Sequence, residues 1–208
     1  MKRLQEHNLN TKEYWDSVYK YGGDENIARL NQVKFLNLAS YIEDWSRVID
    51  LGCGDGNLCK VILAAKRNCQ ITGLDFSKRM IYELDKDYPT INFISGDVTN
   101  TGLKSEFDYV ITTEVLEHLD KPQELIDESY RLLKKGGKFI LTTPYKDHVP
   151  SREHVFEFDY KDVEKMLEKF SESWVFPWAS GWSQVKNVND SMKYQAGHWD
   201  IIMAVAIK

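Results

Sequence analysis

The sequence has few cysteines and no long apolar run, and both shortages limit what the protein can be. Its three cysteines, Cys53, Cys59 and Cys69, are odd in number and contain no Cys-x-x-Cys spacing. Neither a disulfide framework nor a zinc knuckle is therefore indicated. The apolar stretch Ile201 to Ile207 is far shorter than the roughly 20 residues that cross a bilayer as a helix, and the chain starts without an apolar signal segment. We expect a soluble, cytoplasmic protein that does not insert into membranes.

An excess of positive charge is also missing. Lys and Arg number 27 against 32 Asp and Glu, which gives a formal net charge of −5. Such a chain has no overall attraction for phosphate backbones, so nucleic acid is not the expected partner. At 208 residues, without an internal repeat, a low-complexity tract or a linker, the chain suits one α/β domain with a single substantial core.

What the sequence does contain is a glycine-rich turn after an apolar run. Val48–Leu51 is followed by Gly52–Gly56, in which every second residue is glycine. Glycines at a strand-to-helix turn allow positive φ and close approach of a ligand, and the next helix offers unpaired N–H groups. A second apolar run ends in Asp75, near the spacing of about 20 residues at which a carboxylate meets a ribose. The two strand ends together predict a nucleotide-like ligand.

The spacing of the glycines indicates which class of nucleotide-like ligand the loop binds. A dinucleotide fingerprint, Gly-x-Gly-x-x-Gly, would place its third glycine at position 57, where this chain has Asn57. Asp50 and Asp55 would repel a pyrophosphate but suit a ligand that carries an ammonium and a sulfonium. S-adenosylmethionine is such a ligand, and a nucleotide-binding oxidoreductase is disfavoured.

Five segments between Arg47 and Pro144 resemble, in order, the motifs of class I S-adenosylmethionine-dependent methyltransferases. They are Val48–Asn57, Leu74-Asp75, Gly96-Asp97-Val98, Phe107–Val110 and Leu133–Lys138. Five ordered motifs seldom coincide by chance. The resemblance implies an enzyme with S-adenosyl-L-methionine as cofactor and S-adenosyl-L-homocysteine as product.

Alternating strand and helix patterns predict a mostly parallel sheet with helices on both faces. We expect strands at 47–51, 70–74, 92–95, 107–112 and 138–143, a helix between an N-cap at Asp120 and a stop at Gly136, and another helix from Tyr160 to Phe170. Two closing strands, around 174–178 and 201–207, look like the family's antiparallel hairpin. The expected fold is a single Rossmann-like domain with seven strands, divided into a helical cap (1–45), a cofactor-binding core (46–144) and acceptor-pocket elements (145–208).

Charge and geometry, read with the family resemblance, assign roles at the cofactor. Asp50 and the glycine loop are expected at the methionyl group, Asp75 at the ribose, Phe76 on the adenine face, and Asp97 with the Val98 amide at the adenine edge. The predicted cofactor-binding residues are Asp50, Gly52, Cys53, Gly54, Gly56, Asp75, Phe76, Asp97, Val98 and Glu114. Tyr14, Trp15 and Tyr21 are expected to cover the pocket.

A hydroxyl acceptor must lose a proton, and histidine is the natural base near neutral pH. Among five histidines, His118 follows the fourth predicted strand, whereas His148 and His154 follow the fifth. Both positions lie at the sheet edge where ligands bind in open α/β folds. His118 and His154 are the predicted catalytic residues.

The same region allows a metal-dependent alternative. Glu114, Glu117 and His118 can face one way on a helical turn and, with His148 or His154, supply ligands for a divalent ion. This set resembles the metal site of small-RNA 3′-terminal 2′-O-methyltransferases. Glu-x-Leu-Glu-His also occurs in metal-free small-molecule enzymes, and Tyr145 stands where the RNA enzymes usually carry Asn.

The prediction is therefore metal-free methyl transfer to an oxygen or nitrogen atom of a small-molecule acceptor. The segment Glu153–Phe158 supports it, because this segment resembles the corresponding region of ubiquinone-type O-methyltransferases. Two alternatives remain open, which are the metal-dependent RNA enzyme and a catalytically silent module that only binds the cofactor. No metal ligand is assigned.

Overall fold

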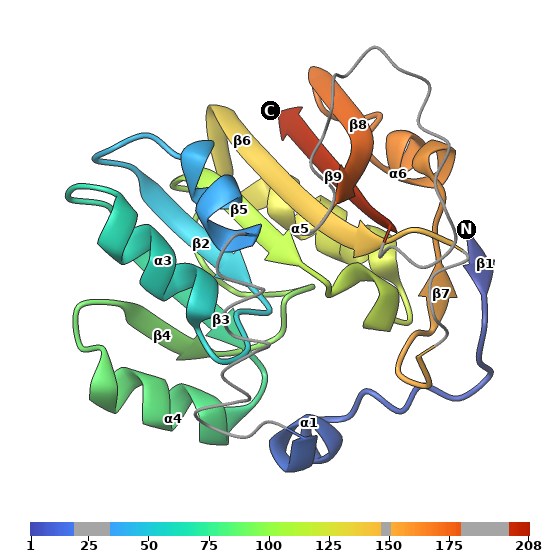
Figure 1. The fold of residues 1–208 in the computed structure, drawn as a ribbon, viewed down its shortest axis with the longest axis horizontal. Coiled ribbons are helices and arrows are strands. Elements are labelled where there is room, and N and C mark those ends of the chain that lie inside the picture. The colour runs from blue at the N-terminus through green and yellow to red at the C-terminus, as the bar shows by residue number, and fades with distance from the viewer. Residues whose placement is uncertain (19–33, 147–150, 180–199) are drawn as a thin grey trace.

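The computed structural model describes residues 1–18, 34–146, 151–179 and 200–208 (Figure 1). Its strands are β1 (Lys2–Arg3), β2 (Arg47–Leu51), β3 (Gln70–Asp75), β4 (Asn92–Ser95), β5 (Phe107–Thr113), β6 (Leu133–Pro144), β7 (Phe156–Glu157), β8 (Glu172–Ala179) and β9 (Asp200–Ile207). Its helices are α1 (Lys12–Val18), α3 (Asn57–Ala65), α4 (Lys78–Asp87), the short 3₁₀ helix η1 (Leu116–His118), α5 (Pro122–Leu132) and α6 (Tyr160–Met166). Residues 34–40 are also helical.

Seven strands form the central sheet in the order β4-β3-β2-β5-β6-β9-β8. Strands β2 to β6 pair in parallel, whereas β9 is antiparallel to both β6 and β8. The predicted seven-stranded, mostly parallel sheet with a C-terminal antiparallel hairpin is confirmed. Because the chain leaves β2 toward β3 on one side and later returns to β5 on the other, the strand order reverses there, which opens a crevice at the carboxyl ends of these strands.

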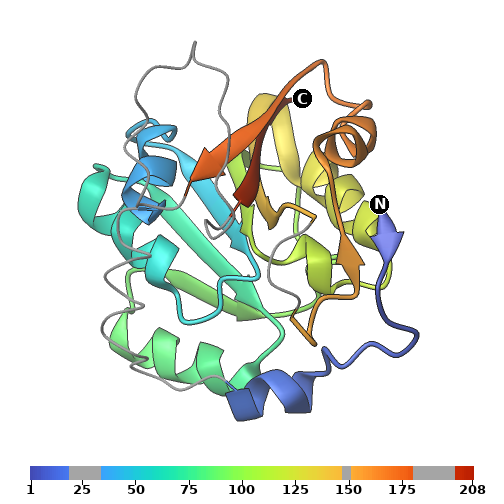
Figure 2. The same ribbon diagram turned by 45° about the vertical axis from the view of Figure 1, so that its right-hand side comes forward.

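Alternation along the strands divides the core between the two faces of the sheet. Ile49 and Leu51 pack with α5 and α6 on one face, and Val48 packs with α3 and α4 on the other. Figure 2 shows the helices on both sides of the twisted sheet. This three-layer arrangement buries the central strands and leaves the carboxyl edge of the sheet for a ligand.

A small two-stranded sheet attaches the N-terminus to the segment after β6. Lys2 and Arg3 of β1 pair antiparallel with Glu157 and Phe156 of β7. From there the chain runs along the molecule to α1, which contacts α4 (Figure 1). This pairing could not be predicted, since two-residue strands carry no periodic pattern.

Two helices, α5 and α6, have boundaries that differ from prediction. The helix after Asp120 begins at Pro122 without a side-chain cap and ends at Leu132, because β6 starts directly at Leu133 and contains Gly136. Asp120 instead accepts hydrogen bonds from the side chains of Arg3 and Asn8. Helix α6 ends at Met166, earlier than predicted. No helix in the described ranges combines the length and apolar character needed to span a bilayer.

Candidate functional site

A cavity of about 890 Å³ lies at the carboxyl ends of the central strands. Its walls come from the glycine loop after β2, the ends of β3, β4 and β5, η1 and the N-terminal segment. The lining residues are Asn8, Asn10, Trp15, Lys34, Phe35, Gly52, Cys53, Gly54, Asp55, Asp75, Phe76, Gly96, Asp97, Val98, Thr99, Thr113, Glu114, Val115, His118, Leu119, Asp120, Lys121 and Glu124. The crevice predicted from the topology is thus a real cavity, large enough for a nucleotide-sized ligand and an acceptor.

The glycine loop is shaped by positive backbone angles. Gly52, Gly54 and Gly56 have φ of 80°, 52° and 72°. A Cβ atom at Gly52 would clash with Val115 Cγ2, so a larger residue has no room there. Gly52, Cys53 and Gly54, which were predicted to bind the cofactor, line the cavity, whereas Gly56 precedes α3 and faces Leu84 and Phe93.

Asp75 connects the loop to the end of β3. Its Oδ2 accepts a hydrogen bond from Gly54 N at 3.1 Å, and its Oδ1 accepts one from Ser77 N at 2.9 Å. Burial raises the pKa of this carboxyl, and the two backbone donors oppose that shift. Asp75 and Phe76 both line the cavity, and their contacts with the ribose and adenine of a ligand stay predictions.

Asp50 lies behind the loop and does not line the cavity. Its Oδ2 accepts a hydrogen bond from Cys59 Sγ of α3 at 3.6 Å, and its Oδ1 has no partner among the described residues. Burial raises the pKa of Asp50 to about 7, and the nearby Asp75 and Asp55 add to the rise. A direct contact between Asp50 and a ligand stays a prediction that this orientation does not support.

The loop after β4 supplies another part of the wall. Gly96, Asp97, Val98 and Thr99 all line the cavity. Asp97 Oδ1 accepts hydrogen bonds from Thr99 N at 2.8 Å and Thr99 Oγ1 at 2.7 Å, which closes a local turn. Asp97 and Val98 therefore line the cavity beyond Asp75 and Phe76 along the sheet edge, and their contact with an adenine edge stays a prediction.

Glu114 stands at the end of β5 in an uncommon backbone conformation, with φ of 54°. Its Oε1 accepts hydrogen bonds from Lys34 Nζ at 3.1 Å and from Thr142 Oγ1 at 2.8 Å. Burial would raise the pKa of Glu114, but the Lys34 ammonium and these hydrogen bonds lower it instead. Lys34 is itself nearly buried and lines the cavity, although nothing in the sequence singled it out.

His118 reaches the same cavity from η1. Its Nδ1 lies 3.0 Å from the carbonyl oxygen of Glu153, a contact that requires the proton on Nδ1 and leaves the lone pair on Nε2. Burial lowers the pKa of His118, although the Glu153 carbonyl and nearby acids oppose the shift. A neutral imidazole with a free basic nitrogen is what a general base requires.

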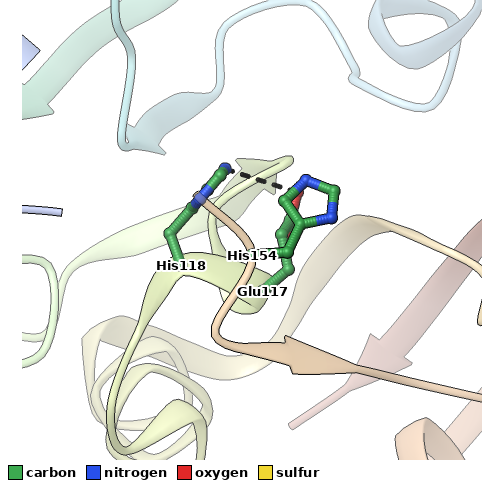
Figure 3. Close-up of side chains that lie close together, drawn as sticks. All are labelled: Glu117, His118 and His154. Carbon is green, nitrogen blue, oxygen red and sulfur yellow. Dashed lines mark ion pairs between the residues drawn. The ribbon is translucent and has the colours of Figure 1, made fainter. Parts of the chain in front are cut away.

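Glu117, His118 and His154 form a compact group (Figure 3). One ligand-type atom from each lies within 4.8 Å of the others, and Glu117 Oε1 is 3.7 Å from His118 Nε2. Glu117 Oε2 accepts a hydrogen bond from Thr143 Oγ1, while Oε1 has no hydrogen-bond partner among the described residues. Burial, with the charge of Glu114, raises the pKa of Glu117 to about 8. Glu114 lies outside this group, and His148 falls outside the described residues.

The N-terminal segment closes the side of the cavity next to His118. Asn8 Nδ2 donates to the carbonyl oxygen of His118 at 3.0 Å, and the Trp15 ring meets the His118 ring edge-on at 5.3 Å. Trp15 lines the cavity as predicted, whereas the Tyr14 hydroxyl bonds to the Glu153 carboxylate. Tyr21 lies outside the described residues. His154 packs against His118 and is not part of the cavity wall.

A family model described as "Methyltransferase domain" matches residues 49–141, which include the glycine loop, Asp75, Asp97 and His118. The chain is 30% identical over 107 residues to a malonyl-[acyl-carrier protein] O-methyltransferase of Enterobacter lignolyticus, covering 51% of this chain and 42% of that protein. It is 30% identical over 139 residues to a ubiquinone biosynthesis O-methyltransferase of Pseudomonas fluorescens, covering 62% and 57%. The chain thus spans about half the length of the curated relatives it matches.

The fold is similar to that of a putative methyltransferase of Haloferax volcanii, solved in complex with the Trm112 methyltransferase activator. The TM-score is 0.71 at 18% sequence identity, and the match covers 94% of this chain and 96% of that one. At this identity the likeness establishes the fold alone.

Proposed function

We propose that this chain, a class I S-adenosylmethionine-dependent methyltransferase by its domain and fold, transfers a methyl group to an oxygen or nitrogen atom of a small molecule. The observation that carries the proposal is one cavity lined both by Asp75 with Phe76 and by His118, whose pKa is lowered by burial. Residues suited to a nucleoside and a residue suited to proton removal therefore face one space.

The residues of the cavity fit S-adenosylmethionine. The Gly52–Gly54 loop would receive the methionyl group, and the Asp75 carboxylate would accept hydrogen bonds from the ribose hydroxyls. Phe76 and Asp97 would take the adenine face and its amino group. The acidic wall, with Asp55, Asp75, Asp97 and Glu114, suits the positive charge of the ammonium and sulfonium.

S-adenosylmethionine supplies a methyl group already activated by its sulfonium, so the protein mainly aligns the acceptor and removes its proton. Alignment of well-oriented reactants contributes on the order of 7–11 kcal/mol. The walls formed by Trp15, Leu119 and Val115 would hold the acceptor beside His118. The Nε2 atom of His118 would then take the proton of a hydroxyl or an ammonium acceptor.

Cofactor binding is tested by isothermal titration calorimetry with S-adenosylhomocysteine. Replacing Asp75 by Ala removes both ribose acceptors, and we expect the affinity to fall by about 2–3 kcal/mol, or 30-fold or more. Asp75→Asn keeps one acceptor for the two backbone donors and serves as the conservative control. If Asp75→Ala binds S-adenosylhomocysteine as tightly as the unaltered protein does, the cavity is not the cofactor site.

Activity is tested by incubating the protein with radiolabelled S-adenosylmethionine and fractionated cell extract, with and without a chelator. Label in the small-molecule fraction that a chelator does not affect supports the proposal. Cofactor binding without label in any fraction would instead indicate a silent binding module.

One observation favours a second candidate, which is transfer assisted by a divalent metal ion. Glu117, His118 and His154 form a group in which a buried carboxylate oxygen, with no hydrogen bond from the part of the chain that the structure describes, lies close to two imidazoles. A carboxylate and two imidazoles form a plausible ligand set, and the Nδ1 contact of His118 with a carbonyl is a common support for such a ligand. Bound metal would polarise acceptor hydroxyls, as in transfer to a terminal ribose of RNA.

Metal binding is tested without reference to activity. Native mass spectrometry of the protein with Mn²⁺ or Mg²⁺ should show one bound ion that Glu117→Gln removes if this candidate is correct. Asp127→Asn, which removes a carboxylate from the exposed face of α5, is the control. A chelator-sensitive label in the RNA fraction would favour this candidate over the first.

A further inference from the structure

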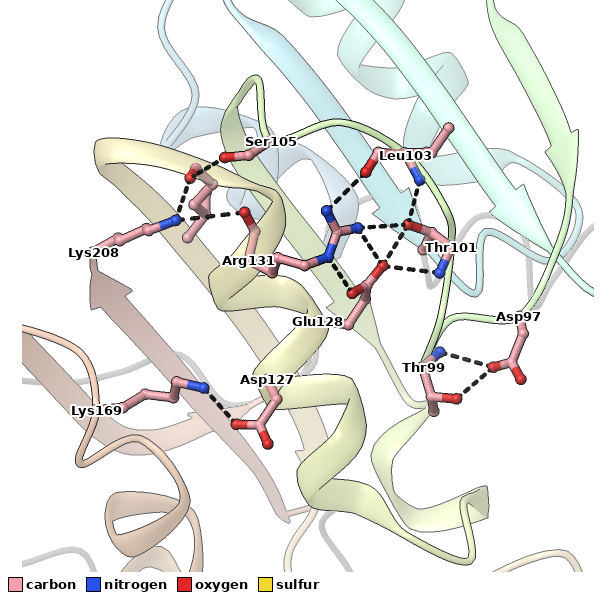
Figure 4. A network of polar contacts seen from close by, with 11 residues as sticks. Asp97, Thr99, Thr101, Leu103, Ser105, Asp127, Glu128, Arg131, Lys169 and Lys208 are labelled. Atoms are coloured by element: carbon pink, nitrogen blue, oxygen red, sulfur yellow. Dashed lines mark hydrogen bonds and ion pairs between the residues drawn. The ribbon is translucent and has the colours of Figure 1, made fainter.

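The loop between β4 and β5 joins the cavity to helix α5. Its first residues, from Gly96 to Thr99, line the cavity, and Val98 and Leu103 pack at the margin of the core. Thr101 and Leu103 lie against α5, where Glu128 and Arg131 project toward them (Figure 4). The segment that carries Asp97 is therefore continuous with a segment that is bonded to α5.

Glu128 holds Thr101 with two hydrogen bonds. Its Oε1 accepts from Thr101 N at 2.8 Å and from Thr101 Oγ1 at 2.5 Å. Arg131 donates to both carboxylate oxygens of Glu128, each at 2.7 Å, and its Nη1 donates to Leu103 O at 2.8 Å. Glu128 is only 7% exposed, although it lies on a helix whose other acids, such as Asp127, are largely in solvent.

This arrangement is more than an ordinary ion pair within a helix. An exposed i,i+3 pair is worth a few tenths of a kcal/mol, but here the carboxylate is buried and also satisfies a backbone N–H of the loop. Hydrogen bonds to a charged acceptor are stronger and more directional than neutral ones. Glu128 thus fixes Thr101 in space. The turn between Asp97 and Thr99 carries that constraint to the cavity wall.

We propose that Glu128, supported by Arg131, is a positioning residue that sets the place of Asp97 and so determines selectivity for the adenine amino group. The inference rests on the proposed function, in which Asp97 accepts a hydrogen bond from that amino group. Glu128 itself does not touch the ligand. Its effect reaches the cavity through Thr101, the turn at Thr99 and Asp97.

The test compares two ligands by calorimetry. One is S-adenosylhomocysteine, and the other is its analogue with hydrogen in place of the adenine amino group. Glu128→Gln should weaken binding of the first by about tenfold, the order expected for one well-placed hydrogen bond, and leave the second nearly unchanged. In the Asp97→Ala background the same substitution should have no further effect, because the affected hydrogen bond is already missing.

Matched variants separate positioning from general stability. Asp127→Asn removes the same charge one residue earlier on α5, where the carboxylate pairs with Lys169 and does not contact the loop. It should leave both affinities unchanged. Thr101→Val should reproduce the selective loss, since it removes the hydroxyl at similar volume, and Thr101→Ser should restore selectivity.

Each outcome decides the inference. An equal loss for both ligands in Glu128→Gln, with a lower melting temperature, would mean that Glu128 only supports the fold. Equal affinity of the unaltered protein for both ligands would show that Asp97 does not read the amino group, which overturns the inference but leaves the proposed function intact. No binding of S-adenosylhomocysteine to the unaltered protein would overturn both.

Discussion

The His118 ring is held from three sides, by the Glu153 carbonyl, by Trp15 and by His154. These contacts fix the tautomer and the direction of Nε2. If His118 is the general base, His118→Gln should lower kcat by 10²–10⁴-fold. The dissociation constant for S-adenosylhomocysteine should stay within about threefold, because in the proposed function His118 serves the acceptor and does not bind the cofactor. Single-turnover rates and calorimetry measure the two effects. A similar loss in His7→Gln, which alters an exposed residue, would point away from this role.

Because burial raises the pKa of Asp50, this residue should make the protein less stable as pH rises. A carboxylate whose pKa is lowered by an ion pair has the opposite effect. Its pKa is raised from 3.8 to about 7 by burial, so between these values the folded state binds more protons than the unfolded state. The free energy of unfolding should therefore fall as pH rises from about 4 to 7, by a few kcal/mol. Asp50→Asn should be more stable than the unaltered protein at pH 8, and this difference should vanish near pH 4. Urea unfolding across this range measures it, and a constant difference would contradict the assignment.

The same residue shows what the sequence could and could not predict about the site. The positions of the glycine loop, Asp75 and Asp97 follow from where strands end, which hydrophobic runs predict well. The side chain of Asp50 points away from the cavity because side chains alternate along β2. Asp50 therefore lies on the same face of the sheet as Val48, toward α3. Lys34 could not be found, because its partner Glu114 is remote in sequence and a single lysine on a helix carries no signal.

At the scale of elements, side-chain caps determine where a helix begins when the hydrophobic pattern does not define its first residue. Helix α6 begins with a reciprocal capping box, in which the side chains of Asp159 and Asp162 each accept a backbone hydrogen bond from the other residue. Asp159→Ala should lower the free energy of unfolding by about 1 kcal/mol, whereas Asp159→Asn should nearly preserve it. The affinity for S-adenosylhomocysteine should not change in either variant, because α6 is remote from the cavity wall. Equal free energies of unfolding for the Ala and Asn variants would mean that the capping hydrogen bond of Asp159 does not stabilise the protein.

Other element boundaries could not be predicted because tertiary contacts override local preference. Asp120 is a good N-cap by residue type, yet Arg3 and Asn8 from the N-terminal segment take its carboxylate. β6 begins at Leu133 because Leu133 pairs with Phe107 of β5. The register of the two strands then shifts, and the next pair is Tyr109 with Lys138. Such pairing joins residues far apart in the chain, and no local pattern contains it.

At the scale of the whole molecule, the N-terminal segment, which lines the cavity with Asn8, Asn10 and Trp15, joins the start of α4 to the chain beyond β6. The hydroxyl of Ser77, at the cap of α4, bonds to Asp16 of α1, while Asn10 of the same N-terminal segment bonds to Glu153 O beyond β6. The strand order and the pairing of β1 with β7 bring these segments together. The pairing of β1 with β7 is not encoded in local periodicity, which explains why the sequence predicted the strands and a cover over the pocket but not how the N-terminal segment is attached.

Because the ligand would contact several of these segments at once, its binding should stabilise the entire fold. S-adenosylhomocysteine at about 100 times its dissociation constant should add about 2.7 kcal/mol to the free energy of unfolding. For a domain of this size that corresponds to a rise in melting temperature of about 5–10 °C. NAD⁺ at the same concentration should produce no shift, since the loop has Asn57 in place of the third glycine and Asp55 in the cavity wall. Asp75→Ala should lose the shift, and a response to NAD⁺ that matches the response to S-adenosylhomocysteine would revive the oxidoreductase alternative.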